Sequence, residues 1–556
     1  MAISSSAPVD PPTSEPSGLF VPSPVPPQDR KWGSFSDTPP WILPSRMPIW
    51  RTGAARRRKD QARELPTYYR APKLPPLRRA LTVARILGQA VLVWAVKERG
   101  RPSSKAGISR RLRVAAERLG PTYIKLAQII SAGEGVFPAE LVAECKKCRD
   151  QVPPVDYPAV VEVVEEQLGR PIHEVFSRFA PTPIAAASIA QVHRATLVDG
   201  TEVVVKVQRP GIDELVKKDL KVLAFIAPLL VGRIPVSALA NPPALVELFA
   251  ETIIEELDFH LEGDNMLDVA EVMVKLNQTG FVIPRPHPEL VTEKILVMEE
   301  LKGFSFDDVA GMKKAGVNTH DVIRTGMIGF LEGAFLHGVF HGDLHGGNLL
   351  VLPDGRTGLM DFGITGRLSD AEKQAFMKMM MTATMNDVNG QVEALRDLGT
   401  LPPGTDVAAV VRDLGLDGPP IDPNKLTPDE LIAELQRIMK ALLGYGARLP
   451  KPLMLYVKNL IFIDGAIATL APDLDLFGEV TYIATHFFTQ HGQTIANELG
   501  VDHGDWQLDL DGIKAGFGVD PTEREALSHA ELTARRAEIN KRLAGENPLK
   551  SFRGFM

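Results

Sequence analysis

The sequence has little cysteine: only Cys145 and Cys148 occur among its 556 residues. Two cysteines cannot form a disulfide framework, so a reducing compartment is expected. Their CxxC spacing is compatible with a zinc or redox site, but no second CxxC and no nearby histidine pair completes a tetrahedral set. We interpret the surrounding segment, residues 140–149, as one charged helix and leave the metal and redox alternatives open.

Targeting and membrane signals are also scarce. The first residues contain neither the basic nor the apolar region of a signal peptide. The two most apolar stretches, residues 80–96 and 453–470, are interrupted by Arg85 and by Lys458 and Asp464, so neither is predicted to span a membrane. A net charge of −7 argues against a nucleic-acid-binding function for the chain as a whole.

The composition changes along the chain. Residues 1–45 hold eleven prolines, and residues 46–80 hold eleven Lys or Arg against two acids, with interleaved aromatic residues. We expect a cytoplasmic protein, with the basic arm and the apolar segment after it offering peripheral attachment to an anionic membrane at its inner face. The predicted parts are a disordered tail and basic arm over 1–79, a helical extension over 80–170, a mixed lobe over 171–303, a mostly helical lobe over 304–490 and a C-terminal tail over 491–556.

One motif carries most of the chemical information. His341-Gly-Asp-Leu-His-Gly-Gly-Asn348 is followed thirteen residues later by Asp361-Phe-Gly363. This spacing of two aspartates and an asparagine is typical of phosphoryl transfer, in which Asp343 orients or deprotonates the acceptor. Asn348 and Asp361 supply the oxygen ligands that Mg²⁺ prefers. The intervening residues, 349–360, predict a hairpin with its turn at residues 353–355.

A site of this type also needs a lysine for the ATP phosphates and a glutamate to hold that lysine. Lys206 lies in a valine-rich predicted strand over 202–208 and faces away from Val203, Val205 and Val207. An exposed surface lysine is the alternative interpretation. A long helix is expected over residues 245–266, and there Glu262 is the preferred partner of Lys206, although Glu256 and Asp258 remain open as competitors.

Two further segments are expected to contact the nucleotide. Met298, Glu299 and Glu300 have the form of a hinge whose backbone would bind adenine. No GxGxxG motif precedes Lys206; an alanine-rich loop stands there instead, and its Cβ atoms limit close approach to phosphate. The cofactor-binding residues predicted on this side are Ala185, Ala186, Ala187, Ser188, Gln191, Val204 and Lys206.

Taken in order, these motifs resemble the UbiB/AarF family of atypical protein-kinase-like (ADCK-like) proteins over residues 110–475. The family's KxGQ element matches Lys125-Leu-Ala-Gln128, with Ala127 in place of glycine, and its ExD element matches Glu256-Leu-Asp258. The resemblance implies that Lys125 belongs to the catalytic set and that Gln128, Glu256 and Asp258 gate the site. It also implies an α+β, two-lobed kinase-like fold with an N-terminal helical extension and a mostly helical C-lobe.

The resemblance further implies an ATPase or a kinase of small molecules or lipids that uses ATP and Mg²⁺ and supports isoprenoid-quinone or lipid metabolism. The expected partner is a small-molecule or isoprenoid lipid acceptor. A generic protein substrate is not expected, because only five residues separate Gly363 from the predicted helix start at Ser369. Two alternatives remain open: a phosphotransferase of the aminoglycoside or choline kinase type, and a nucleotide-gated scaffold without catalysis.

Overall fold

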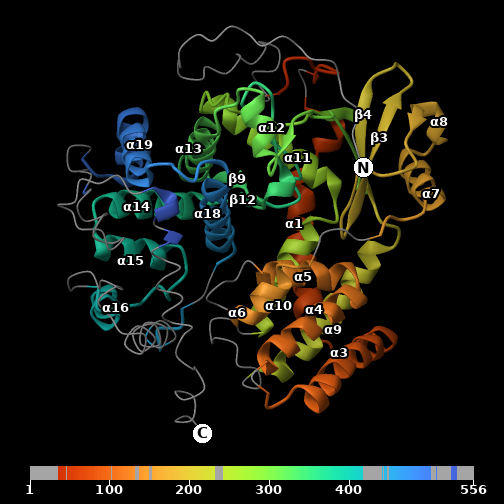
Figure 1. Ribbon diagram of the computed structural model, residues 1–556, viewed down its shortest axis with the longest axis horizontal. Helices are drawn as coiled ribbons and strands as arrows, with labels where there is room; N and C mark the ends of the chain where they lie inside the picture. Colours follow the sequence, from red (N-terminus) through yellow and green to blue (C-terminus); the bar gives the residue numbers. More distant parts are fainter. Residues whose placement is uncertain are drawn as a thin grey trace.

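The structure is a computed structural model that describes residues 35–44, 47–101, 103–131, 137–148, 153–231, 242–416, 441, 444–447, 450–502, 509, 528–531 and 533–534. Figure 1 shows two lobes beside each other, with a layer of helices below them. The smaller lobe contains the β3–β4 sheet, and the larger lobe is mainly helical. The expected α+β, two-lobed architecture is confirmed.

A six-stranded antiparallel sheet forms the smaller lobe, in the order β1-β3-β4-β7-β6 with β2 paired to β3. Its valine-rich strand has Val203, Val205 and Val207 buried against helix α7, while Lys206 faces the opposite side. Strands β3 and β4 form an antiparallel hairpin, and Gly200 has the positive φ of 91° that its turn requires. The elements are α7 (Tyr157–Leu168), α8 (Ile172–Val175), β1 (Phe176–Phe179), β2 (Ala185–Ala186), β3 (Ala190–Leu197), β4 (Glu202–Gln208), β6 (Pro286–Val291) and β7 (Ile295–Met298).

The single long helix expected over 245–266 is in fact two helices, α10 (Pro242–Glu255) and α11 (Phe259–Lys275). The chain breaks between them, where the Asp258 side chain accepts a hydrogen bond from the His260 N–H at 3.0 Å and so caps α11. The break matters for the site because Glu256 lies in it and Glu262 lies in the first turn of α11.

The larger lobe packs two small sheets against helices. One sheet has the order β5-β11-β10-β8, and β9 pairs with β12. The predicted hairpin after Asn348 is confirmed as β10 and β11, and the capping box of Ser369 and Glu372 starts α14. The elements are β5 (Phe281–Val282), β8 (Phe304–Ser305), α12 (Val309–Lys314), α13 (Thr319–His337), β9 (Val339–His341), η2 (Gly346–Asn348), β10 (Leu349–Val351), β11 (Thr357–Leu359), β12 (Thr365–Arg367), α14 (Asp370–Thr384), α15 (Val388–Asp397), α16 (Val407–Leu414), α18 (Lys451–Leu470) and α19 (Leu476–Leu499).

The helical layer is discontinuous in sequence, which differs from the extension expected over 80–170. Helices α9 and α10, assigned above to the small lobe, pack against α2, α3 and α5 (Figure 1). Helix α7, assigned above to the extension, covers the small-lobe sheet instead. The layer contains α2 (Pro66–Tyr69), α3 (Leu77–Lys97), α4 (Ser104–Leu119), α5 (Pro121–Ser131), α6 (Ala139–Cys145), α9 (Ile212–Leu230) and α10.

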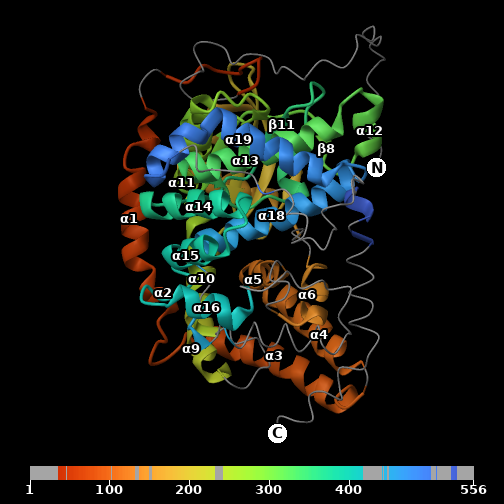
Figure 2. The ribbon, with the colours of Figure 1, turned by 90° about the vertical axis from the view of Figure 1, so that its left-hand side faces the viewer.

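The disordered tail expected over residues 1–45 is corrected for residues 35–44, which the structure describes, and the basic arm that follows forms helical structure. Residues 49–51 form η1 (Ile49–Arg51), and helix α1 (Ala54–Glu64) runs along one side of the molecule (Figure 2). Arg51 forms an ion pair with Asp264 of α11 at 2.6 Å, and Arg58 pairs with the same carboxylate. Part of the basic arm is therefore neutralised by the protein itself. Residues 1–34 of the predicted tail lie outside the described residues.

The segment before η1 contacts both lobes. Phe35 is fully buried and lies under the Arg285 guanidinium, with 4.8 Å between the guanidinium carbon and the ring centre. Asp37 pairs with Arg356, in the turn between β10 and β11, at 2.9 Å. The indole N–H of Trp41 donates to the Pro286 carbonyl at 3.1 Å. Through these contacts residues 35–41 pack against both lobes.

Among the residues that the structure describes, two helices are long and apolar enough, by length and composition alone, to cross a membrane: α3 and α18. The expectation that neither helix spans a membrane stays a prediction. In α18, 39% of the most apolar window is buried, and in α3 only 11%. A core helix of a soluble protein meets the same criterion, so α18 is accounted for by its packing in the large lobe. Helix α3 leaves Leu77, Leu81, Val91, Leu92 and Val96 exposed.

Candidate active site

The strand lysine and the helix glutamate meet as expected. The Lys206 ammonium lies 2.7 Å from the Glu262 carboxylate and 3.0 Å from Asp361. Both Lys206 and Glu262 are buried, with side chains 11% and 3% exposed. Burial raises the pKa of Glu262 to about 7, although Lys206 acts in the opposite direction. Lys206 is therefore not the exposed surface lysine of the alternative interpretation.

The segment from His341 to Asn348, here called the catalytic loop, is held in place by the imidazole of His341. The His341 ring donates through Nε2 to the Met360 carbonyl at 3.1 Å and accepts the Asp343 N–H through Nδ1 at 3.2 Å. The Asn348 amide donates through Nδ2 to the Asp343 carbonyl at 3.0 Å. This bond fixes the orientation of the amide and leaves its oxygen as the atom that can bind a cation. The loop thus holds Asp343 and Asn348 in a fixed relation to the segment that leads to Asp361.

A buried asparagine on α18 secures the same loop. The Asn459 amide donates to the His341 carbonyl and accepts the Leu344 N–H at 3.1 Å, and its side chain is fully buried. Its neighbour Lys458 contacts the Asp343 carboxylate directly. Sequence reasoning had noted Lys458 only as a charge within an apolar stretch. The polar Lys-Asn pair inside an otherwise apolar helix was the signal that could have identified both residues.

Two lysines converge on Asp343. Lys458 contacts one carboxylate oxygen, and the Lys125 ammonium lies 3.7 Å from the other. Burial acts to raise the pKa of Asp343, but Lys458 and Lys125 outweigh it and hold that pKa well below its usual range. Asp343 is therefore ionised throughout the physiological pH range. Its two carboxylate oxygens face the ammonium groups of Lys458 and Lys125.

The three acids that could compete for Lys206 have separate partners. Glu262 binds Lys206, Glu256 binds Lys125 at 2.7 Å, and Asp258 caps α11. Burial acts to raise the pKa of Glu256, and Lys125 acts to lower it, with a net upward shift. The ion pair between Lys125 and Glu256 brings α5 onto the cleft beside Asp343.

Helix α5 tolerates Ala127 because this residue faces away from the cleft. Ala127 is 4% exposed and packs against Cys145 and Cys148. Lys125 and Gln128, three residues apart, lie on one face of the helix. The two cysteines are therefore part of a small apolar cluster. The helix expected over residues 140–149 is shorter, because α6 ends at Cys145.

The alanine-rich loop forms a tight turn over the sheet edge. Ala187 N–H donates to the Ala190 carbonyl at 2.8 Å, and the Ala187 carbonyl accepts from the Arg209 guanidinium at 2.9 Å. Ala185 and Ala186 form β2, and Ser188 is buried. The turn is therefore held by a backbone bond of its own and by the Arg209 side chain.

Gln191 corrects one prediction. It pairs in register with Val207, on the side of the sheet covered by α7, and not with Lys206. Its amide accepts the Val155 N–H at 2.8 Å and lies 2.8 Å from the His193 ring. Gln191 is therefore a buried structural residue, and the expectation that it contacts the nucleotide is overturned by the strand register.

At the hinge, Val204 and Met298 lie opposite each other on neighbouring strands and belong to the apolar cluster on the Lys206 side of the sheet. Glu299 points elsewhere: its carboxylate accepts the Arg285 N–H at 3.1 Å, and its own N–H donates to the Arg285 carbonyl at 2.9 Å. The predicted contact between the Glu299 N–H and adenine is therefore corrected. The Glu300 side chain binds Arg194 of β3 at 2.7 Å.

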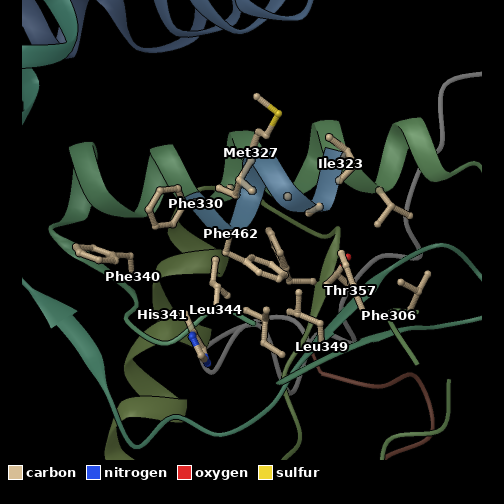
Figure 3. Close-up of a pocket in the computed structure, with 18 of the residues that line it drawn as sticks. Phe306, Ile323, Met327, Phe330, Phe340, His341, Leu344, Leu349, Thr357 and Phe462 are labelled. Carbon is tan, nitrogen blue, oxygen red and sulfur yellow. The ribbon is translucent and has the colours of Figure 1, made fainter. Parts of the chain in front are cut away.

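An apolar cavity of about 80 Å³ lies directly behind the catalytic loop. Figure 3 shows the His341 and Leu344 side chains at one edge of this cavity and Phe330, Met327 and Phe462 across it. Its lining comes from α11, α13, α18 and the small sheets of the large lobe, and His341 and Thr357 are its polar residues.

The segment after Asp361 is short. Asp361 has a positive φ of 58°, and β12 returns at once to pair with β9 before α14 begins at Asp370. A Cβ atom at Gly342 would lie 3.0 Å from the Ile364 carbonyl oxygen, so the loop has no space for a larger side chain at this position. The segment between Asp361 and α14 is therefore compact.

A strand lysine paired with a helix glutamate, facing an Asp-Asn loop and a second aspartate between two lobes, defines the protein-kinase-like class. The ABC1 atypical kinase-like domain family matches residues 147–395. The chain belongs to this family of UbiB and AarF proteins, which its sequence motifs had predicted.

Three relatives illustrate the similarity. An uncharacterized protein of Mycobacterium tuberculosis is 34% identical over 64% of this chain and 73% of its own length. A probable protein kinase UbiB of Marinobacter nauticus is 31% identical, over 68% and 69%. An uncharacterized chloroplastic aarF domain-containing protein kinase of Arabidopsis thaliana is 31% identical, over 66% and 72%. A solved structure of a Mycobacterium tuberculosis protein with erythromycin is 23% identical, covers 62% of this chain and 90% of its own, and has a TM-score of 0.37.

Proposed function

We propose that the protein binds Mg-ATP between its lobes and transfers the γ-phosphoryl group to a small acceptor hydroxyl or to water. The observation that carries this proposal is the convergence of Glu262 and Asp361 on the Lys206 ammonium, at 2.7 and 3.0 Å, beside the loop that holds Asp343 and Asn348. A kinase-like fold uses ATP and a metal in general, and these residues fit both. The Asp361 carboxylate is 46% exposed, and the Asn348 amide oxygen is oriented as described above.

In this proposal each residue has one task. Lys206, held by Glu262, binds the α- and β-phosphates, while Asp361 and the Asn348 oxygen bind Mg²⁺, which neutralises charge on the phosphates. Asp343 accepts a hydrogen bond from the acceptor hydroxyl and orients its oxygen toward the γ-phosphorus. The bond from the β,γ-bridging oxygen to phosphorus breaks, ADP leaves, and the acceptor proton is released.

The contacts of Lys125 and Lys458 with Asp343 describe a resting state. Both carboxylate oxygens of Asp343 face ammonium groups, which compete with an acceptor hydroxyl for the lone pairs of these oxygens. We infer that turnover requires Lys125 to leave Asp343, while Glu256 and Gln128 gate this movement of α5. A protein substrate would meet α5 at the same place, which supports a small acceptor.

The acceptor class we favour is apolar, an isoprenoid or quinone-like lipid, which would connect the protein with isoprenoid-quinone or lipid metabolism. The supporting feature is the apolar lining behind His341, which would give a lipid acceptor an apolar wall close to the catalytic loop; the cavity itself, at about 80 Å³, is too small to enclose an isoprenoid chain. A phosphotransferase of the aminoglycoside or choline kinase type would instead need a polar, acidic acceptor site. A scaffold without catalysis would not need an oriented Asp343.

The test is ATP hydrolysis by the full chain, with and without a panel of isoprenoid, quinone-precursor, choline and aminoglycoside acceptors. We expect Mg²⁺-dependent turnover that an apolar acceptor stimulates and that Asp343→Asn reduces by roughly 100-fold or more. Asp307→Asn, at an exposed aspartate outside the site, is the matched control. Wild-type binding of ATP without any turnover would favour the scaffold, and equal turnover by Asp343→Asn would contradict the assigned role.

A further inference from the structure

A second cluster of metal-binding side chains lies where α19 packs on α13, and the proposed function does not use it. Phe487 of α19 is 1% exposed and packs edge-on against Phe335 of α13, with ring centres 6.2 Å apart. His486 and His491 of α19 lie close to this anchor, and both rings face Glu332 of α13. The packing therefore fixes two imidazoles against one carboxylate.

The three donor atoms converge. The Nε2 atoms of His486 and His491 lie 2.8 and 2.9 Å from the same oxygen, Oε1 of Glu332. All three atoms lie within 4.8 Å of one another. The histidine side chains are 27% and 20% exposed, whereas the Glu332 side chain is 4% exposed. The cluster is thus buried on its carboxylate side and accessible on its histidine side.

The usual explanation of a buried carboxylate is an ion pair with lysine or arginine. Across the part of the chain that the structure describes, no lysine or arginine forms an ion pair with Glu332. The second oxygen of Glu332 accepts only a long hydrogen bond, 3.4 Å, from the Gln278 amide among the bonds identified. Two imidazoles and a carboxylate are instead the ligand set that first-row transition metals prefer.

We propose that Glu332, His486 and His491 form a binding site for a divalent transition metal of the zinc type. Zinc binds imidazole nitrogen and carboxylate oxygen at about 2.0–2.2 Å, so neighbouring ligand atoms of a tetrahedral site lie about 3.3 Å apart. The distances from the two histidine Nε2 atoms to Oε1 of Glu332, 2.8 and 2.9 Å, need to open by only about half an ångström to admit the ion. Three protein ligands leave a fourth position for water on the exposed side.

Such a site would link α13 and α19, two helices of the large lobe that lie far apart in the sequence. Helix α13 continues through Gly338 directly into β9, which ends at His341. A bound ion would therefore fix α19 against the helix that leads into the catalytic loop. Its chemistry differs from that of the Mg²⁺ site, because imidazole favours transition metals and the oxygen ligands of the cleft favour Mg²⁺.

The experiment uses the full chain without a polyhistidine tag, stripped with a chelator and titrated with Zn²⁺ or Co²⁺ in excess Mg²⁺. Excess Mg²⁺ occupies the oxygen ligands of the cleft, so the remaining signal reports the histidine site. We expect one equivalent of Zn²⁺ to bind and to raise the thermal midpoint. Co²⁺ should give visible bands of nitrogen and oxygen ligation and no thiolate charge-transfer band.

His486→Gln and His491→Gln, made separately, should each weaken binding by roughly 100-fold or more, because each removes a direct ligand. His320→Ala is the control, since this histidine lies on α13, the helix of Glu332, but is paired with Asp473. Unfolding curves without metal show whether each variant is folded, and the wild-type Co²⁺ spectrum tests the ligands without any substitution. Absence of binding by wild type, unchanged binding by both glutamine variants, or a thiolate band from Cys145 and Cys148 would overturn the proposal.

Discussion

Replacing Lys206 by methionine should make the stability of the fold depend on pH above neutrality, because Glu262 would lose its cation. The two side chains are buried and their charged atoms lie 2.7 Å apart. Burial raises the pKa of Glu262 to about 7 while Lys206 acts to lower it. Without Lys206 the lowering contribution disappears, and the pKa of Glu262 rises further.

The sign follows from proton binding. The folded pKa of Glu262 lies above its unfolded value of about 4.3, so the folded state binds more protons, and this contribution to stability is lost as the pH rises through the folded pKa. In wild type, the loss of this contribution to the free energy of unfolding is largely complete just above neutrality. In Lys206→Met the free energy of unfolding continues to fall above neutrality, at about 1.4 kcal/mol per pH unit. The free energy of unfolding of the variant should therefore fall further behind wild type by up to about 3 kcal/mol between pH 7 and pH 9.

Thermal and urea unfolding at several pH values would measure this difference. Lys218→Met is the matched control, because Lys218 pairs with Glu214 at the surface, where the side chains are 53% and 71% exposed; it should show no such trend. Adding Glu262→Gln to Lys206→Met should remove the pH dependence. A constant difference between wild type and Lys206→Met over this range would refute the reasoning that Glu262 is the titrating partner.

Three further outcomes are expected. Asp361→Asn should abolish the Mg²⁺-dependent part of the thermal shift caused by ATP, and a shift equal to that of wild type would remove Asp361 from the metal site. Asn459→Ala should destabilise the protein by about 2–4 kcal/mol in urea unfolding, because the backbone groups of the loop at His341 lose buried partners; a loss below about 1 kcal/mol would contradict this. Leu81→Glu with Leu92→Glu should reduce salt-sensitive co-sedimentation with anionic liposomes, since both side chains lie exposed on α3; unchanged pelleting would move the membrane contact elsewhere.

The folded state of the N-terminal segment changes how membrane attachment is tested. Arg51 and Arg58 bind Asp264 of α11, so deleting residues 1–79 would remove part of the folded protein as well as basic charge. Point substitutions on α3 avoid this problem. Leu92 is a suitable position because it is exposed, whereas Leu87 of the same helix packs inward with Val83.

Local patterns in the sequence determined most of the catalytic elements. The valine alternation around Lys206, the turn at Gly200 and the capping box at Ser369 all act over a few residues, so their structures follow from backbone geometry and nearby hydrogen bonds. The family was predicted from the order of such motifs. The Asp343 loop and the hairpin after Asn348 were predicted for the same reason.

The tertiary structure alone decided which distant groups meet. The sequence favoured Glu262 as the partner of Lys206 but left Glu256 open; the helix break at Asp258 decides between them by directing Glu256 toward Lys125 and Glu262 toward Lys206. Lys458 reaches Asp343 only because α18 packs behind the catalytic loop. The sequence by itself therefore determined which residues form the candidate site, and the packing of helices far apart in the chain decided their partners, because burial and ion pairing depend on neighbours that a linear pattern does not contain.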